Sequence, residues 1–443
     1  MQRRYLKRAL QKSYPHMNTT KSRELYNQNK EYILQVTPFR TPVLVKGKGN
    51  RVWDADGNEY IDMMSGQFCL AFGHSYTPLN RVITKQLTKL THTNTLSLTE
   101  EMFDAARELA SITGGKLKKA ILLSTGAEAV ECALRYAKFY TKKDGIVGID
   151  SGYHGLTLAT QSISSKGMYA MPKVHDSFSI PSPDWLDRPK GISVENFIKQ
   201  ILEESRNRLE EHKGKIAAFV IEPVISVGGM IYPPTSYFEG IRELAKEHNA
   251  LLIFDECQTG LGRTGKWFGY EHYGIIPDVL VLAKISGAGF PASAVMISDE
   301  IAAAVEGKFI HFSSHQNDPL SGAILAFVIR HMKEKKILDK INRQGNFILK
   351  QLKNLAKTEV WLENPRGLGL MLGFDVPRSL FINGKNPGAD LITILENKGI
   401  IIQAIRKGRT FRILPDYLIS RADCVQFINI LKEGFIELHQ MYG

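Results

Sequence analysis

The chain has 443 residues, of which 43% are hydrophobic and 23% charged, with a net charge of +12. This composition excludes a disordered, collagen-like or disulfide-framework protein, and the length allows two or three domains. No apolar run approaches the ~18 residues that a membrane span needs, and the four cysteines form no CxxC pair, so we expect a reducing, cytoplasmic location.

The positive charge is concentrated at the N-terminus, ahead of the first acidic residue, Glu24. A solvated basic tail is the favoured interpretation. An anion- or nucleic-acid-attracting patch and an organellar presequence stay open, because such segments are rich in Arg and poor in acids. The basic residues are Arg3, Arg4, Lys7, Arg8, Lys12, Lys21 and Arg23.

Short apolar runs alternate with stretches of helical period between about residues 100 and 300. This alternation predicts an α/β fold, in which crossover helices join buried and mostly parallel strands. The predicted strands are 120–123, 145–149, 216–221, 250–254, 278–283 and 292–297. The predicted helices are Glu101 to Ile112, Ala127 to Tyr140, Val194 to Glu211 and Ser236 to His248.

Polar residues come directly after five of these predicted strands. Open α/β sheets bind ligands at the carboxyl ends of their strands, so we expect the five clusters to converge on one edge of the sheet. The clusters are Ser124-Thr125-Gly126, Asp150 with Tyr153-His154-Gly155, Glu222-Pro223, Asp255-Glu256 and Lys284.

Three segments describe the expected domain organisation. Residues 61–330 would form the large domain, and residues 1–60 and 331–443 would together form a smaller α+β domain. The C-terminal part has a Lys-rich helical pattern at 326–357 and short strand patterns near 368–375 and 399–414.

Residues 260–265 read GLGRTG and match the dinucleotide fingerprint GxGxxG letter for letter. That fingerprint also requires a helix that opens on it and an acid about 20 residues later. The following residues, KWFGY, do not resemble an opening helix. We therefore expect a tight loop here, and a nicotinamide dehydrogenase would explain this motif and nothing else.

Residues 124–129 read STGAEA and stand between a predicted strand and a predicted helix. The N–H groups of Gly126 and Ala127 would open the helix, and a helix N-terminus carries partial positive charge that can hold a phosphate. The alternative is an ordinary Ser/Thr N-cap.

Lys284 and Asp255 are unusual residues at the ends of apolar strands. Burial would make Lys284 a nucleophilic amine, as Schiff-base chemistry requires, and Asp255 could hold a protonated ring nitrogen. A structural lysine and an Asp N-cap are the alternatives. With Tyr153 as a stacking aromatic and the phosphate cradle of Gly126, these residues meet the four needs of pyridoxal 5'-phosphate.

The chain is similar to the class III pyridoxal-phosphate aminotransferases of fold type I from about residue 42 to 415. The fold type implies a large domain with a mostly parallel seven-stranded sheet flanked by helices, and a smaller domain from both termini. The motifs that carry this resemblance are DADGNEYIDMMSG, STGAEAVE, YHG, IEPV, DECQTGLGRTG, PDVLVLAK and RGLGLMLG.

The resemblance implies a role for each site residue. Lys284 would bind the cofactor covalently, Asp255 would pair with its pyridine nitrogen, and Arg412 would bind a substrate carboxylate. The other cofactor-binding residues would be Thr125, Gly126, Ala127, Tyr153, Glu222, Gln258 and Ser314.

A narrower resemblance is to 2,2-dialkylglycine decarboxylase, a decarboxylation-dependent aminotransferase. Gln67 in Ser65-Gly66-Gln67 and the segment SSHQNDPL (313–320) carry it. It implies that Gln67 acts on the substrate carboxylate in catalysis and that Ser314 reaches the phosphate across a dimer interface. It also implies an alkali cation, potassium or sodium, with the ligands Thr99, Ser314, Gln316 and Asp318.

The chain departs from the decarboxylase pattern at Tyr153, Ser314 and Val227, where the pattern has Trp, Thr and a second Ser. The change at Val227 alters the expected carboxylate subsite, so the substrate need not be a dialkylglycine. From the resemblance as a whole we predict a homodimer or dimer of dimers that acts on an amino acid and a keto acid by decarboxylation-dependent transamination. The alternative is an ordinary class III aminotransferase or a racemase. We expect no nucleic-acid partner, because a nucleic-acid-binding protein would explain the positive charge and none of the motifs. We also expect no membrane partner.

Overall fold

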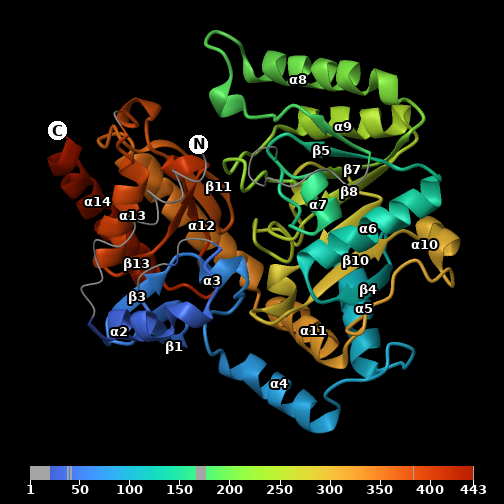
Figure 1. Ribbon diagram of the computed structural model, residues 1–443, viewed down its shortest axis with the longest axis horizontal. Helices are drawn as coiled ribbons and strands as arrows, with labels where there is room; N and C mark the ends of the chain where they lie inside the picture. Colours follow the sequence, from blue (N-terminus) through green and yellow to red (C-terminus); the bar gives the residue numbers. More distant parts are fainter. Residues whose placement is uncertain (1–19, 37–38, 40–41, 166–175, 383, 443) are drawn as a thin grey trace.

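The computed structural model describes residues 20–36, 39, 42–165, 176–382 and 384–442 (Figure 1). The basic residues from Arg3 to Lys12 lie outside the described part. Within that part, no helix has both the length and the apolar character that crossing a membrane requires.

A seven-stranded sheet forms the centre of the larger half of the molecule. Its order is β4-β10-β9-β8-β7-β5-β6, and every neighbouring pair is parallel except the two that involve β10. The predicted α/β class with a mostly parallel sheet is confirmed. The strands are β4 (Lys119–Leu123), β5 (Gly145–Ile149), β6 (Ser177–Ile180), β7 (Ile216–Ile221), β8 (Leu251–Asp255), β9 (Val279–Leu282) and β10 (Ser293–Ile297).

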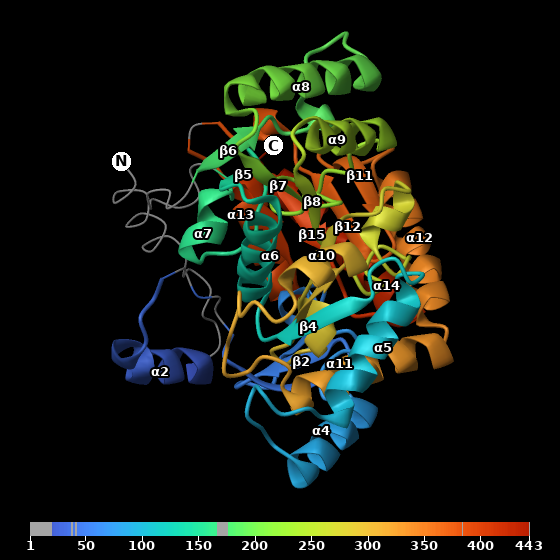
Figure 2. The same ribbon diagram turned by 90° about the vertical axis from the view of Figure 1, so that its right-hand side faces the viewer.

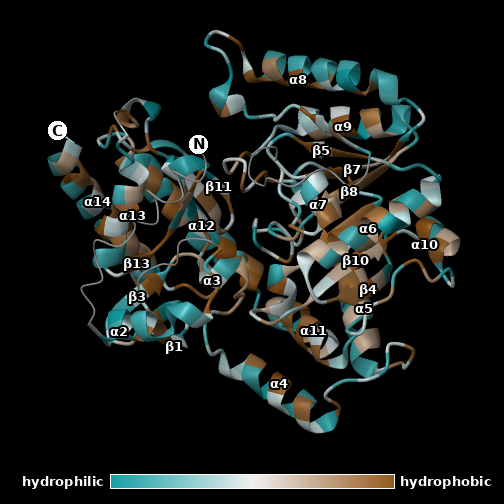
Figure 3. Cartoon of the chain, in the orientation of Figure 1, coloured by the Kyte–Doolittle hydropathy of each residue, from teal (hydrophilic) through white to brown (hydrophobic). Residues whose placement is uncertain are grey.

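Helices cover both faces of this sheet, which is why its strands are apolar throughout. Alternate residues of β7 pack on opposite sides: Phe219 belongs to the core beneath α8 and α9, and Val220 to the core beneath α6 and α10. Figures 1 and 2 show these two helix layers, and Figure 3 shows that the strands are hydrophobic and much of α8 is hydrophilic. The helices of the larger half include α4 (Thr77–Lys89), which packs on α11 and not on the sheet, α5 (Glu100–Ile112), α6 (Gly126–Thr141), α7 (Leu158–Ser162), α8 (Val194–Leu209), α9 (Thr235–Glu247) and α10 (Asp299–Val305).

Two four-stranded sheets form the smaller half, and one of them joins the two ends of the chain. Strand β13 pairs in parallel with β3, with Ile400 opposite Ile61. The first sheet has the order β1 (Leu44–Lys48), β2 (Arg51–Asp54), β3 (Glu59–Asp62) and β13 (Ile400–Ile401). The second has the order β11 (Glu363–Leu368), β12 (Met371–Asp375), β15 (Thr410–Ile413) and β14 (Gln403–Ile405). The helices of this half include α2 (Thr20–Asn29), α3 (Ser65–Phe68), α13 (Pro387–Asn397) and α14 (Arg421–Tyr442).

The helical pattern at 326–357 is confirmed as helical, and the structure divides it between two helices. Helix α11 (Pro319–Glu334) ends before Lys336, which has a φ of 48°, and α12 (Ile337–Leu355) starts after it. The two helices have different partners, since α11 packs on α5 whereas α12 packs on β11 and α14. A break is therefore required between them.

The GLGRTG segment forms consecutive turns between β8 and β9, as expected for a tight loop. Its Arg263 is fully buried and donates hydrogen bonds to the carbonyls of Leu370 (3.1 Å) and Pro415 (2.6 Å). The same guanidinium lies over the ring of Tyr417, 4.7 Å from its centroid. The motif thus connects the large sheet to the C-terminal segment.

Candidate active site

Asp255 and Lys284 are brought to one edge of the large sheet by two adjacent parallel strands. Asp255 is the last residue of β8 and is aligned with Val281 of β9. Lys284 follows β9 and begins a short 3₁₀ turn, η5 (Lys284–Gly287), with a φ of 52°. This left-handed conformation is uncommon for a residue with a side chain, and such strain is often found at functional sites.

Asp255 is held by two hydrogen bonds in a buried setting. Its Oδ1 accepts from the Cys257 N–H (3.0 Å), and its Oδ2 lies 2.8 Å from His154 Nδ1. Burial alone would raise the pKa of Asp255, but His154, the side chain of Cys257 and the charge of Lys284 lower it below its ordinary value. Burial likewise disfavours charge on His154, yet its bond to Asp255 raises its pKa. The carboxylate therefore stays ionised.

His154 is a residue to which the sequence interpretation gave no role. The YHG motif contains it, but a lone His next to a Tyr gives no sign that it will face a carboxylate 101 residues away. Its Nε2 is buried and has no hydrogen-bond partner among the described residues.

The N-terminus of α6 lies against the ends of β8 and β9 and against the YHG loop, and two glycines permit the close approach. A Cβ on Gly126 would lie 3.0 Å from Cys257 Sγ and 3.2 Å from the Cβ of Ala283. Gly155 has a φ of 115°, and a Cβ there would lie 2.7 Å from the Cβ of Ala127. The STGA turn, the YHG loop and the ends of β8 and β9 are therefore in contact. Thr125 caps the helix by accepting from the Glu128 N–H.

Glu222 connects the YHG loop to the segment that follows β7. Its two carboxyl oxygens accept from the N–H groups of Tyr153 (2.8 Å) and Ser226 (3.4 Å). Complete burial raises the pKa of Glu222 to about 7, helped by the negative charge of Asp255 and opposed by His154.

This pKa predicts how stability depends on pH. A carboxyl whose pKa is higher in the folded protein than the ordinary 4.5 lowers stability as pH rises from that value to about 7, with no further loss above. Glu222→Gln cannot ionise, so its stability relative to wild type should improve by about 2 kcal/mol between pH 5 and pH 8. Urea unfolding at the two pH values measures the difference. If the free energies of unfolding of Glu222→Gln and wild type differ by the same amount at pH 5 and pH 8, the pKa of Glu222 is not raised in the folded protein.

Arg412 is a buried cation whose side-chain acceptors among the described residues are neutral. It lies opposite Gln403 in the β14–β15 pair and donates to the Gln403 side-chain oxygen and to Ser226 Oγ (3.3 Å). Its guanidinium lies over the ring of Phe68, 4.5 Å from the centroid. Burial lowers the pKa of Arg412 to about 10. A buried guanidinium with only neutral acceptors is suited to an anionic ligand.

Gln67 lies exposed in the short α3 segment next to Phe68, so it is adjacent in sequence to the residue that contacts Arg412. Gln258 follows the Asp255 strand, and its side-chain oxygen is buried without a hydrogen-bond partner among the described residues. Gln403 was not predicted, because only the register of two short strands places it opposite Arg412.

The residues predicted to bind an alkali cation lie at the starts of α5 and α11 and on the loop before α11. Thr99 caps α5 by accepting from the Met102 N–H, and Asp318 caps α11 by accepting from the Leu320 N–H. The second oxygen of Asp318 faces two histidines. Ser314 is exposed on the loop before α11, and Gln316 is on the same loop. The alkali cation stays a prediction.

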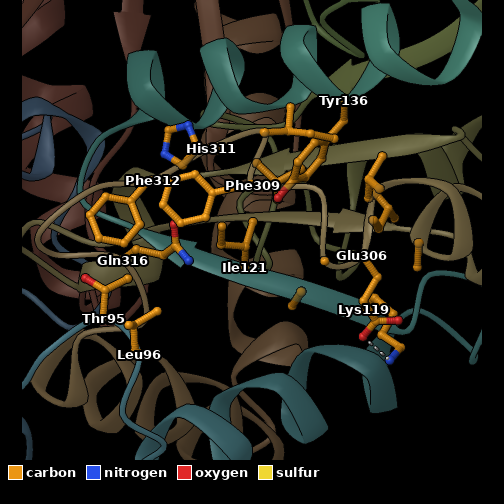
Figure 4. Close-up of a pocket in the computed structure, with 17 residues that line it drawn as sticks. Thr95, Leu96, Lys119, Ile121, Tyr136, Glu306, Phe309, His311, Phe312 and Gln316 are labelled. Carbon is orange, nitrogen blue, oxygen red and sulfur yellow. Dashed lines mark hydrogen bonds and ion pairs between the residues drawn. The ribbon is translucent and has the colours of Figure 1, made fainter.

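A cavity of about 300 Å³ opens beside the same loop, at the β4 edge of the sheet. Gln316, His311 and Phe312 line it together with Ile121 and Tyr136 (Figure 4). Its lining includes neither Lys284 nor Asp255. This cavity is therefore separate from the candidate active site.

The residues at the strand ends fit pyridoxal phosphate. Lys284 offers an amine, Asp255 offers a buried ionised carboxylate, and Tyr153 offers an aromatic ring. The first N–H groups of α6 have no acceptor within their own helix, so the turn at Gly126 can bind a phosphate. The unpartnered side-chain oxygen of Gln258 can meet a further polar group.

Comparisons with known proteins agree with this chemistry. The family model "Aminotransferase class-III" matches residues 35–435. An uncharacterized aminotransferase of Schizosaccharomyces pombe is 32% identical over 419 residues, which cover 91% of this chain and 93% of the relative. An acetylornithine aminotransferase of Methanocaldococcus jannaschii is 32% identical over 415 residues, covering 92% and 97%. The crystal structure of a transaminase from the marine bacterium Virgibacillus shares the fold, with a TM-score of 0.87, 24% identity, and coverage of 95% of this chain and 100% of that one.

Proposed function

Because the chain belongs to the class-III aminotransferase family, we propose that it transfers the amino group of an amino acid to a keto acid. Pyridoxal phosphate, which the family implies, would bind where β8 and β9 end. The pair of Asp255 and Lys284 is the observation that carries the proposal, since adjacent strands present a buried ionised carboxylate and an amine at one edge.

Each residue has a part in the proposed mechanism. When bound, the cofactor supplies an electron sink that weakens a bond at the carbon beside the substrate nitrogen. Asp255 would accept a hydrogen bond from the pyridine N–H and keep that proton in place, while His154 fixes the carboxylate. Lys284 Nζ would carry a proton from and back to the substrate. Tyr153 would stack on the ring, and the N–H groups of Gly126 and Ala127 would bind the phosphate.

Arg412 would bind the carboxylate of the substrate. A carboxylate at this site would replace neutral acceptors with a charge-matched partner, which is a stronger interaction for a guanidinium. Both half-reactions would use the same site, because amino acids and keto acids share this carboxylate. The M. jannaschii relative is named for acetylornithine, so N-acetylornithine belongs in the first panel of amino donors.

Gln403→Glu tests this subsite. A glutamate opposite Arg412 would neutralise the guanidinium and compete with the substrate carboxylate. We expect KM for amino acid donors to rise about tenfold, which corresponds to about 1.4 kcal/mol, with kcat little changed. Steady-state kinetics with an amino acid and with a primary amine that lacks a carboxylate gives the measurement and its control. An equal rise in KM for both donors would show that Arg412 does not bind the substrate carboxylate.

Decarboxylation-dependent transamination is the second candidate, supported by the position of Gln67 next to Phe68, whose ring contacts Arg412. The relatives reported above are aminotransferases, which favours the ordinary reaction as the main proposal. We expect no CO2 from the wild-type enzyme, and only a small loss of amino transfer in Gln67→Ala. CO2 release that falls about 10²–10³-fold in Gln67→Ala, with amino transfer reduced much less, would establish the decarboxylating reaction instead.

A homodimer or larger assembly is also part of the proposal. Several large apolar side chains are exposed on the loops before α5 and α11, which a monomer would leave in water. They include Leu96 (78% exposed), Leu98 (72%) and Phe309 (75%). Ser314 is exposed on the same surface, so a second copy could receive its hydroxyl. Sedimentation that gives the mass of one chain would contradict this assembly.

A further inference from the structure

A cluster of metal-binding side chains lies outside the proposed active site, between the loops that precede α5 and α11. His92 comes from the first loop, and His315 and Asp318 come from the second. One ligand atom from each lies within 4.8 Å of the other two. In the sequence, His92 is 226 positions from Asp318 and 223 positions from His315 (315 − 92). Only the tertiary structure brings the three side chains together.

The separations of the ligand atoms suit a small tetrahedral metal ion. Zinc binds nitrogen and oxygen ligands at about 2.0–2.2 Å, which places tetrahedral ligand atoms about 3.3 Å apart. His315 Nδ1 lies 3.3 Å from Asp318 Oδ2. His92 Nδ1 lies 2.7 Å from the same oxygen, so a small outward rotation of this ring would admit the ion.

The backbone around these ligands is fixed by hydrogen bonds. Asp318 uses its other oxygen to cap α11, accepting from the Leu320 N–H at 3.0 Å. Asn317 pairs with Leu122 of β4 through both its N–H (2.9 Å) and its side-chain oxygen (3.0 Å). Thr95 Oγ1 donates to the Ser313 carbonyl at 3.0 Å, which joins the two loops. Metal ligands supported in this way need little reorganisation to bind.

We propose that His92, His315 and Asp318 bind one divalent transition-metal ion, for which zinc is the reference. Two imidazoles and a carboxylate are typical zinc, copper, iron and nickel ligands, whereas alkali and alkaline-earth ions prefer oxygen atoms alone. In the single chain the side chains of His92 and His315 are 43% and 64% exposed, so water, or a group from the second copy in the proposed assembly, can complete the coordination. The site does not depend on the proposed reaction.

Isothermal titration calorimetry of the cofactor-loaded enzyme with zinc chloride tests the proposal. Wild type should bind one zinc ion per chain, and its melting temperature should rise with zinc. His92→Asn and His315→Asn should each weaken binding at least about tenfold. Asp318→Asn should do the same while the helix cap remains, because Asn is as good an N-cap as Asp. His439→Asn, in a His–Glu pair with Glu359 elsewhere, is the matched control and should bind as wild type.

Three results would overturn the assignment. They are no zinc binding by wild type, equal binding by wild type and the three ligand variants, and equal weakening in His439→Asn. Potassium chloride provides a comparison with the alkali-cation prediction, since an oxygen-bound potassium ion would be insensitive to loss of either imidazole. Binding of potassium without zinc is one form of the first result, and it would support the alkali-cation prediction instead.

Discussion

Lys284→Ala should abolish amino transfer, with a loss of at least about 10²–10⁴-fold in kcat, the contribution of one positioned acid–base group. The residue is the sole lysine among the strand-end clusters described above, and it stands beside Asp255 at the end of the neighbouring strand. Cofactor affinity should fall less than activity, because Asp255 and the α6 N-terminus are unchanged.

Two measurements accompany this variant. Borohydride reduction of the wild-type enzyme should fix the cofactor covalently, and peptide mapping should locate it on Lys284. Lys266→Ala, in the GLGRTGK segment, is the control, since its amine donates to the Glu271 carbonyl at the surface. Attachment to any other lysine, or full activity of Lys284→Ala, would refute the site.

Asp255→Asn should lower kcat by about 10²–10³-fold, the cost of removing one preorganised electrostatic partner. The amide would keep the shape and one acceptor oxygen, but it carries no charge to hold the pyridine proton. The folded protein should be retained, and cofactor absorbance together with steady-state rates would report the change.

Glu256→Gln is the matched control for Asp255→Asn, because both acids are buried at the end of β8. Glu256 accepts from Thr259, Gly269 and Tyr270, and burial raises its pKa to about 7. Its replacement should change stability more than kcat. Equal losses of kcat in the two variants would mean that Asp255 has no special part in the reaction.

The strand pattern predicted the large sheet because its strands are buried on both faces and are therefore apolar throughout. Each of the six predicted strands overlaps an observed one. Strand β6, with the sequence SFSI, was missed because it is short, at the sheet edge and half polar. The break at Lys336 was missed because helical period continues across it while the packing partners change.

The site was predictable where a residue follows a buried strand, as with Asp255 and Lys284. It was not predictable where tertiary contacts decide. The bond between His154 and Asp255 depends on how the YHG loop returns to β8, and Gln403 meets Arg412 only through strand register. The reaction was likewise not predictable from Gln67, since one exposed amide does not decide whether the substrate carboxylate is retained or lost as CO2.

The measurement that tests the central claim most directly follows nitrogen and carbon dioxide in one vessel. Purified enzyme with pyridoxal phosphate would receive an amino acid labelled with heavy nitrogen and an unlabelled keto acid, and mass spectrometry would follow the label while CO2 is collected. We expect the label in the amino acid formed from the keto acid, with no accompanying CO2 and no transfer by Lys284→Ala. Failure to transfer label from any donor in the panel, or one CO2 released for each amino group transferred, would contradict the proposed reaction.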